Sequence, residues 1–335
     1  MWAIDNQTPF AARGLWGRDR DGVHEWLVSV KGTYDILPTG ELRLCDEQPE
    51  PRIEPLYRGE PGSSSLVYDT EVTGLKPTTD IVVNGTAYAP GGRARTSFDL
   101  AIQVGPVRKT IRVRGDRWWR RGPLGVSPSS AAPIERVPVV YERAYGGFDQ
   151  SDPDPARQRL DTRNPVGRGV ARSASTLVDQ PVYNFEYPTG DPEKAGPAGF
   201  GALASYWSPR REHMGTYDEA WQSSRKPLLP LDWDPRTRLC TPTDQQPERP
   251  LAGGEQATLL NWTPNGLLQF TLPRVEVQFE TQHATHRESH EGQLATVVIE
   301  PDDARLTMVW SSALPCRTDI DLLERTIVSE ATSSR

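Results

Sequence analysis

Cysteine is scarce in this chain, and its three cysteines lie far apart. Cys45, Cys240 and Cys316 form an odd set without a close pair. A disulfide framework needs paired cysteines, and a structural zinc site of the usual kind needs cysteines a few residues apart. The sequence argues against both, and we expect reduced cysteines that serve as packing residues.

Long hydrophobic runs are missing as well. No stretch approaches the ~18 apolar residues of a membrane-spanning helix, and the first residues lack the basic and apolar regions of a signal peptide. The formal net charge is −7, with 45 acidic and 38 basic residues. Nucleic-acid-binding proteins present a net basic surface instead. We therefore expect a cytoplasmic protein that binds neither membrane nor nucleic acid.

Helical periodicity is rare, whereas strand patterns recur at both ends of the chain. Alternating apolar residues and β-branched content predict strands over residues 25–36, 81–89, 97–104, 107–115, 256–260, 267–272, 275–280, 293–300 and 305–311. We predict an all-β fold of mainly antiparallel, sandwich-like sheets, with long loops and one or few short helices.

The middle of the chain has a different texture, because proline recurs every several residues between residues 122 and 250. We divide the chain into an N-terminal β region (1–121), a loop-rich middle segment (122–250) and a C-terminal β region (251–335) expected to pack with the first. Long loops inside a compact domain are usually functional or covered by a partner. One helix is predicted over residues 216–224, with Thr216 as its N-cap and Glu219 at the capping-box position.

Motifs for nucleotide binding and covalent catalysis are absent from the sequence, which has neither a GxxxxGK[ST] loop nor a GxSxG elbow. The best metal candidate is the group His283, His286 and His290, with Glu288 and Glu291 nearby. The same segment also fits a polar, solvated hairpin tip. We favour that interpretation and expect no metal and no cofactor, with metal binding as the alternative.

Ten tryptophans and ten tyrosines suggest two classes of function. Aromatic faces stack on sugar rings, so a carbohydrate-active or metal-dependent β-fold enzyme is one hypothesis. Tryptophan, tyrosine and arginine are also the favoured anchors of protein interfaces. Because Trp118 and Trp119 stand among charged residues, we favour a protein interface.

Two parts of the sequence supply the candidate partner-binding residues. Strand periodicity persists over residues 137–144, and residues 141–147 are predicted to form a strand that ends in a diglycine turn. This strand places Glu142 and Arg143 on opposite faces, and either could pair with Asp116 or Arg117. Around the predicted helix, we expect three aromatic residues to cluster and two arginines to reach outward. The full candidate set is Asp116, Arg117, Trp118, Trp119, Arg143, Tyr145, Arg168, Trp207, Arg210, Arg211, Tyr217, Asp218 and Trp221.

Several strings, taken in order, resemble one family. They include WLVSVKGTYDI, TDIVVNGTAYAPGG, VGPVRKTIRVRGDRWW, VPVVYERAYGGFD, NPVGRG, PAGFG, LPLDWD, the pair Asp244-Gln245 and GGEQATLLNWTPNGLLQFTLP. In order and extent they are similar to the domain of unknown function 2169 family, which occurs beside VgrG and PAAR spike genes of Gram-negative type VI secretion systems. The resemblance implies an adaptor or chaperone rather than an enzyme. Such a protein would hold an effector, or its PAAR-containing part, for loading onto the VgrG spike.

Overall fold

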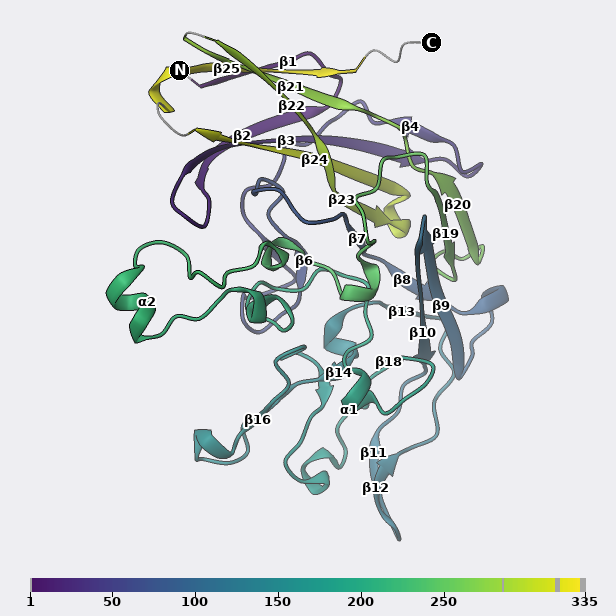
Figure 1. The fold of residues 1–335 in the computed structure, drawn as a ribbon. Helices are drawn as coiled ribbons and strands as arrows, with labels where there is room; N and C mark the ends of the chain where they lie inside the picture. Colours follow the sequence, from purple (N-terminus) through teal and green to yellow (C-terminus); the bar gives the residue numbers. More distant parts are fainter. Residues whose placement is uncertain (1, 285, 317–319, 332–335) are drawn as a thin grey trace.

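A computed structural model describes residues 2–284, 286–316 and 320–331 of the chain. Three larger sheets and several two-stranded ladders make up most of it, which confirms the predicted all-β fold (Figure 1). The described helices are short: α1 (Pro192–Ala195), α2 (Glu219–Ser224) and several single turns of 3-10 helix. No helix in the described part of the chain combines the length and the apolar character that crossing a membrane requires.

The largest sheet combines strands from the two ends of the chain. It has the order β2 (Ala11–Arg18), β3 (His24–Ile36), β24 (Arg305–Cys316), β23 (Gln293–Glu300) and β7 (Asp80–Val83), and β4 (Leu42–Leu44) also pairs with β3. All of its ladders are antiparallel except that between β23 and β7. Segments more than 200 residues apart in the sequence are therefore joined by backbone hydrogen bonds.

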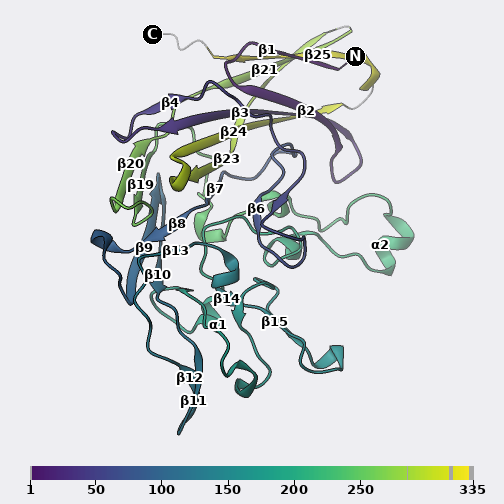
Figure 2. The ribbon, with the colours of Figure 1, turned by 180° about the vertical axis from the view of Figure 1, so that it is seen from behind.

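Two further sheets lie against this one. The first has the order β1 (Ala3–Asn6), β25 (Leu323–Glu330), β21 (Val277–His283) and β22 (Arg287–Glu291). It forms the top layer in both ribbon views (Figure 2). The second has the order β18 (Phe185–Glu186), β10 (Val107–Arg114), β9 (Ser97–Val104), β19 (Gln256–Leu260) and β20 (Leu267–Thr271). One continuous hydrophobic cluster packs residues from all three sheets together.

Segments between residues 56 and 169 form small ladders below the largest sheet (Figure 1). These ladders pair β5 (Leu56–Tyr57) with β6 (Leu66–Tyr68), β8 (Thr86–Tyr88) with β13 (Arg136–Pro138), β11 (Trp119–Gly122) with β12 (Gly125–Pro128), β14 (Tyr145–Gly146) with β17 (Arg168–Gly169), and β15 (Phe148–Asp149) with β16 (Arg159–Leu160). A ladder this short is marginal in water by itself. Contacts with the body of the protein must therefore hold these loops in place.

Three of the five lysines are buried and ion-paired. Lys31 lies 2.8 Å from Glu71, Lys76 lies 2.7 Å from Asp80, and Lys109 lies 2.8 Å from Asp244. A buried ammonium is costly unless it has a charged partner and hydrogen bonds. These pairs therefore fix which segments of the chain can meet inside the protein.

The Lys76–Asp80 pair joins all three regions of the chain. Lys76 also donates to the Thr296 hydroxyl at 2.9 Å, and Asp80 accepts hydrogen bonds from the backbone N–H groups of Cys240 and Thr241. Burial disfavours both charges, but their attraction outweighs it and keeps the pKa of Lys76 raised and that of Asp80 lowered. Both side chains stay ionised in the interior.

Lys109 gives the protein a specific pH dependence. Burial lowers the pKa of Lys109 to about 8, although Asp244 opposes the shift, whereas lysine in an unfolded chain has a pKa near 10.4. Between these values the unfolded chain binds more protons, so stability rises with pH. From about pH 7.5 to about pH 9.5, Lys109 should add about 2 kcal/mol to the free energy of unfolding.

Urea denaturation at the two pH values measures this contribution. The Lys109→Met variant keeps the side-chain length and removes the titrating group, so its stability should lack the additional rise. An equal rise in the variant and the wild type would assign the pH dependence to other groups.

Candidate partner-binding site

A polar network holds the residues around Asp116 in place. The buried Asn184 donates from Nδ2 to Asp116 Oδ1 at 2.9 Å and to the carbonyl of Arg114 at 3.0 Å. Arg143 Nη1 donates to Asn184 Oδ1 at 3.1 Å and lies 3.5 Å from Asp116 Oδ1. The pairing of Arg143 with Asp116 that we considered from the sequence is present, and Asn184 is the residue that joins them.

The adjacent Arg117 and the two tryptophans take different roles. Arg117 Nη2 donates to the Tyr183 carbonyl at 3.0 Å and lies 3.6 Å from the Glu186 carboxylate. Trp119 packs against a small cluster that contains Tyr145 and Tyr183, whereas Trp118 is 45% exposed. Successive residues of an extended chain point to opposite sides, so Trp119 anchors the segment and Trp118 faces solvent.

Two glycine-containing strings, YERAYGG and NPVGRG, fold around Asn164. This buried side chain donates to the carbonyls of Tyr141 at 2.8 Å and Tyr145 at 2.9 Å. Gly146 has a φ of 145°, and a Cβ there would lie 2.3 Å from the Asn164 carbonyl oxygen. Only glycine fits this close approach.

The strand predicted over residues 141–147 is present at Tyr145–Gly146 (β14) but is wrong over residues 141–144. Tyr141–Arg143 forms a turn of 3-10 helix, because the Tyr141 carbonyl binds Asn164 instead of a neighbouring strand. Glu142 therefore turns toward the N-terminal region, where its carboxylate accepts hydrogen bonds from the backbone N–H and the hydroxyl of Ser65.

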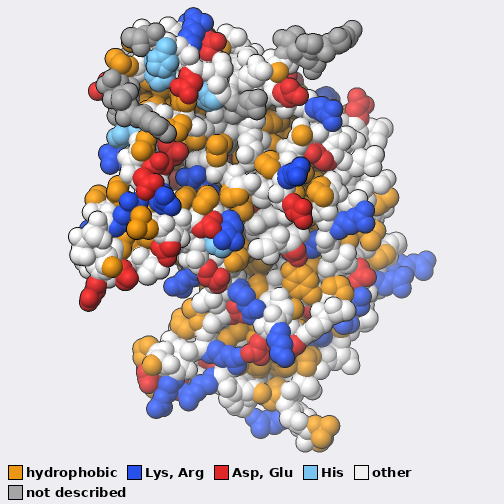
Figure 3. Space-filling view, in the orientation of Figure 1, with side chains coloured by type: hydrophobic (Ala, Val, Ile, Leu, Met, Phe, Trp, Pro, Cys, Tyr) orange, Lys and Arg blue, Asp and Glu red, His pale blue; other side chains and the backbone are white. Residues whose placement is uncertain are grey.

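Beside these strings lies an open groove of about 570 Å³. Its walls include Glu142, Phe148, Asp149, Arg168, Leu177 and Gln180. Phe148 is 44% exposed, although it is a large apolar side chain. In Figure 3, basic and hydrophobic side chains are interspersed over the lower part of the molecule, where this region lies. An exposed aromatic ring beside a groove is typical of a protein interface.

Arg168 is the charged group of the groove that the protein leaves unpaired. Its guanidinium makes no hydrogen bond and no ion pair with any residue that the structure describes. Burial, together with the neighbouring Arg143, lowers the pKa of Arg168, although the carboxylates of Asp116 and Glu142 oppose the shift. The acidic groups of the groove are engaged instead: Glu142 binds Ser65, and Asp149 accepts from the backbone N–H groups of Ser151 and Arg172. The groove thus offers a positive charge and an apolar surface to a ligand.

The candidate residues around the predicted helix do not form the expected cluster. Trp207 is fully buried in the main core and packs edge-on against Tyr141, with ring centroids 5.6 Å apart. Arg210 does not reach outward: it is buried, lies 2.7 Å from Asp69 and donates to the carbonyls of Leu203 and Thr237. The alternating charges around residue 210 gave no sign of this burial. Arg211 is exposed, as we expected.

Tyr217, Asp218 and Trp221 form a separate unit on a projecting loop (Figure 1). The predicted N-cap Thr216 is wrong, because Asp218 caps α2 through a 2.8 Å hydrogen bond to the Trp221 N–H, and Thr216 instead binds Asp232. The rings of Tyr217 and Trp221 meet edge-on at 4.7 Å, and Tyr217 is 49% exposed. The pair on one helix face is present, but neither the main core nor Trp207 covers it.

Replacing Trp221 by Ala should therefore destabilise the loop and spare the core. The substitution removes the ring contact with Tyr217 and the 2.8 Å hydrogen bond from Trp221 Nε1 to the Leu228 carbonyl. We expect the free energy of unfolding to fall by about 1 kcal/mol. Replacing a tryptophan in the core by Ala would lower it by about 3–5 kcal/mol. Hydrogen exchange should show lost protection confined to residues near 219–228. In the matched Trp221→Phe variant, which retains a ring, protection should be partly kept; a global loss of protection in Trp221→Ala would contradict this account.

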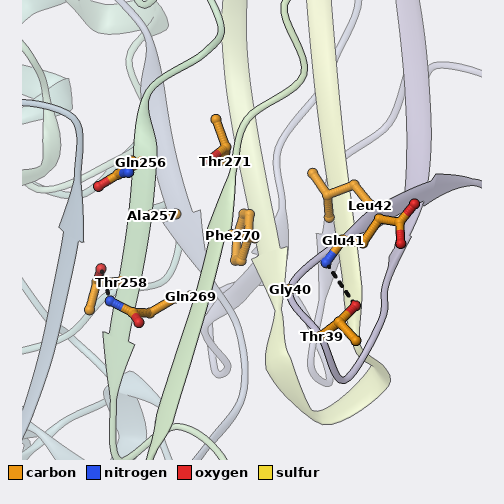
Figure 4. A pocket seen from close by; sticks show the side chains of 10 residues that line it. All are labelled: Thr39, Gly40, Glu41, Leu42, Gln256, Ala257, Thr258, Gln269, Phe270 and Thr271. Atoms are coloured by element: carbon orange, nitrogen blue, oxygen red, sulfur yellow. Dashed lines mark hydrogen bonds between the residues drawn. The ribbon is translucent and has the colours of Figure 1, made fainter.

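A second hollow, of about 430 Å³, lies between the β3–β4 turn and the β19–β20 hairpin (Figure 4). Its walls are mainly threonine and glutamine side chains with Phe270 and Leu42, and Glu41 is their single titratable group. A glycosidase site of the usual kind needs two facing carboxylates. This hollow does not provide such a pair.

Sequence reasoning missed Phe148, Asn164 and Asn184. Phe148 and Asn164 lie in the strings YERAYGGFD and NPVGRG, whose paired glycines signalled special backbone geometry. The glycines indicated that the chain turns there, but they did not indicate that the turns enclose the side chain of Asn164. Asn184 carried no signal, because its partners come from segments about 40 and 70 residues away.

Comparison with known proteins gives one match. A protein-family model described as an uncharacterized protein conserved in bacteria (DUF2169) matches residues 21–311. No curated protein and no solved structure gives a significant match to the chain. The matched range includes the groove, the three buried lysine pairs and the α2 loop.

Proposed function

The chain belongs to the domain of unknown function 2169 family, and from this premise we propose that it is a type VI secretion adaptor or chaperone. In this proposal it binds an effector, or the PAAR-containing region of an effector, in the cytoplasm and presents it for loading onto the VgrG spike. The strings that resemble the family support the proposal, since the family occurs beside VgrG and PAAR genes. The protein acts by holding its partner and needs no catalytic group.

The observation that carries the proposal is the groove between β14, β17 and the loop before Pro181. It combines the exposed Phe148 with Arg168, which forms no ion pair with any described residue. An unpaired, half-buried guanidinium is best satisfied by a carboxylate, which it binds in a bidentate manner. The partner segment suited to this groove therefore carries an acidic residue next to an apolar one.

The residues around the groove are suited to a protein that binds and holds a partner. Asn164 fixes the strings that form the walls of the groove through buried hydrogen bonds to the Tyr141 and Tyr145 carbonyls, so little ordering is required when a partner binds. Trp118 is exposed next to the Asp116 network and provides a second aromatic anchor. Preformed aromatic and arginine anchors account for most of the binding energy in protein interfaces.

Deleting the gene in its host tests the proposal. The effector encoded beside it should no longer be secreted, whereas effectors encoded elsewhere should be delivered normally. Restoring the wild-type gene should restore secretion. Normal secretion of the neighbouring effector in the deletion strain would overturn the proposed function.

A further inference from the structure

The β21–β22 hairpin brings together three potential metal ligands at its tip. A nitrogen of His283, a nitrogen of His286 and a carboxylate oxygen of Glu288 all lie within 4.8 Å of one another. The two imidazole rings are stacked, with centroids 4.5 Å apart and planes 5° from parallel. This is the one group of three or more such ligands found among the described residues. The sequence alone favoured a solvated hairpin tip without metal.

Backbone hydrogen bonds place His283 next to His286 and to the adjacent strand. The His283 N–H donates to the His286 carbonyl at 2.8 Å and so closes the hairpin. The Ala284 N–H donates to the Leu322 carbonyl at 3.0 Å, and His283 pairs with Leu323 at the start of β25. His283 is therefore tied both to His286 and to the adjacent strand β25.

One polar atom in the group has no partner within the protein. His283 Nε2 is buried and forms no hydrogen bond with any described residue. A buried imidazole nitrogen without a partner is unfavourable, because it has lost its hydration without compensation. A metal ion bound at this nitrogen would satisfy it.

The third histidine of the segment is not part of the group. His290 stacks on Phe279 at 5.5 Å, and its Nε2 lies 2.9 Å from the Thr281 hydroxyl. Its Nδ1 is hydrogen-bonded to the Ser312 hydroxyl. Both ring nitrogens are thus occupied by the protein, so the ligand set that the structure supports contains two histidines and one glutamate.

We propose that His283, His286 and Glu288 form a binding site for a zinc ion. Imidazole nitrogen and carboxylate oxygen are both common zinc ligands, and three protein ligands leave the fourth tetrahedral position open for water or for a donor of a partner. Ligand atoms on one tetrahedral zinc are about 3.3 Å apart. His286 and Glu288 are exposed, and binding an ion requires the stacked rings of His283 and His286 to turn so that a nitrogen of each faces it.

The role of this ion is to cross-link the two strands at the hairpin tip. The hairpin lies in the top sheet, at the end of the molecule opposite the β11–β12 ladder (Figures 1 and 2). The site is therefore independent of the candidate partner-binding groove, and the zinc proposal stands or fails separately from the adaptor proposal.

Isothermal titration of untagged protein with Zn²⁺ tests the site. The wild type should bind one equivalent, and its melting temperature should rise with Zn²⁺ and return after chelation. His283→Ala and His286→Ala should each weaken binding by more than about 100-fold, since even a supporting residue contributes 10–100-fold. His213→Ala, which removes a histidine outside the group, is the matched control and should bind as the wild type does.

Circular dichroism of the zinc-free variants distinguishes a lost ligand from a lost fold. If His283→Ala unfolds the hairpin, the Glu288→Gln variant is used for the binding test in its place, because the amide keeps the size of the side chain and removes its charge. Absence of saturable Zn²⁺ binding by the wild type would overturn the proposal. Equal affinity of the wild type and the folded ligand variants would overturn it as well.

Discussion

Replacing Lys76 by Met is expected to lower the free energy of unfolding by about 3–5 kcal/mol. The Lys76 side chain is 3% exposed and that of its partner Asp80 is fully buried. Methionine fills a similar volume but leaves the Asp80 carboxylate without a counter-charge. The hydrogen bonds from Cys240 and Thr241 remain, but they do not replace a positive charge in a medium of low polarity.

Equilibrium denaturation in urea measures this loss. The matched control is Lys194→Met, because Lys194 is exposed in α1, and this change should alter stability by less than about 0.5 kcal/mol. A second substitution that removes the orphaned charge, Asp80→Asn, should recover part of the loss in the double variant. Wild-type stability for Lys76→Met would show that the pair does not hold the three regions together.

Several strands were predictable because their sequences either alternate strongly or form a short, nearly continuous apolar run. Residues 97–104, 256–260 and 293–300 form strands with the predicted bounds, and each has a buried face or is buried throughout. The strand β22 was not predicted, since its sequence RESHE is polar and its hairpin depends on pairing with β21. The pattern of apolar residues along the sequence indicates which strands are buried. It does not indicate that a polar strand such as β22 pairs with a neighbour.

The long-range polar contacts could not be predicted. Lys76 and Asp80 are four residues apart, and such a pair usually lies in solvent. Here it is buried because Thr296 and the backbone of residues 240–241 close over it. Likewise, Arg210 stands in a charged string but is buried against Asp69. Both cases depend on which distant segments meet, and one sequence does not contain that information.

The second large effect concerns the groove. Replacing Phe148 by Ala and Arg168 by Glu should weaken partner binding by about 2 kcal/mol or more for each change, or roughly 30-fold in Kd. The melting temperature should change little, because Phe148 is 44% exposed and Arg168 makes no described ion pair. The carboxylate introduced by Arg168→Glu would face Arg143 and would repel an acidic partner segment.

Arg93→Glu is the matched control for charge reversal. Arg93 is exposed in the connection between β8 and β9 and does not line the groove. This variant should therefore bind the partner with wild-type affinity. A loss of binding in Arg93→Glu equal to that in Arg168→Glu would indicate a general charge effect rather than recognition in the groove.

The most direct test of the adaptor function is a titration of the purified protein with the purified effector, or its PAAR-containing region, encoded beside it. We expect a saturable complex with the wild type and with Arg93→Glu. The Phe148→Ala, Arg168→Glu double variant should retain the wild-type melting temperature and lose most of its affinity. No complex with the wild type would contradict the adaptor function, and unchanged affinity of the folded double variant would contradict the assignment of the groove as its binding site.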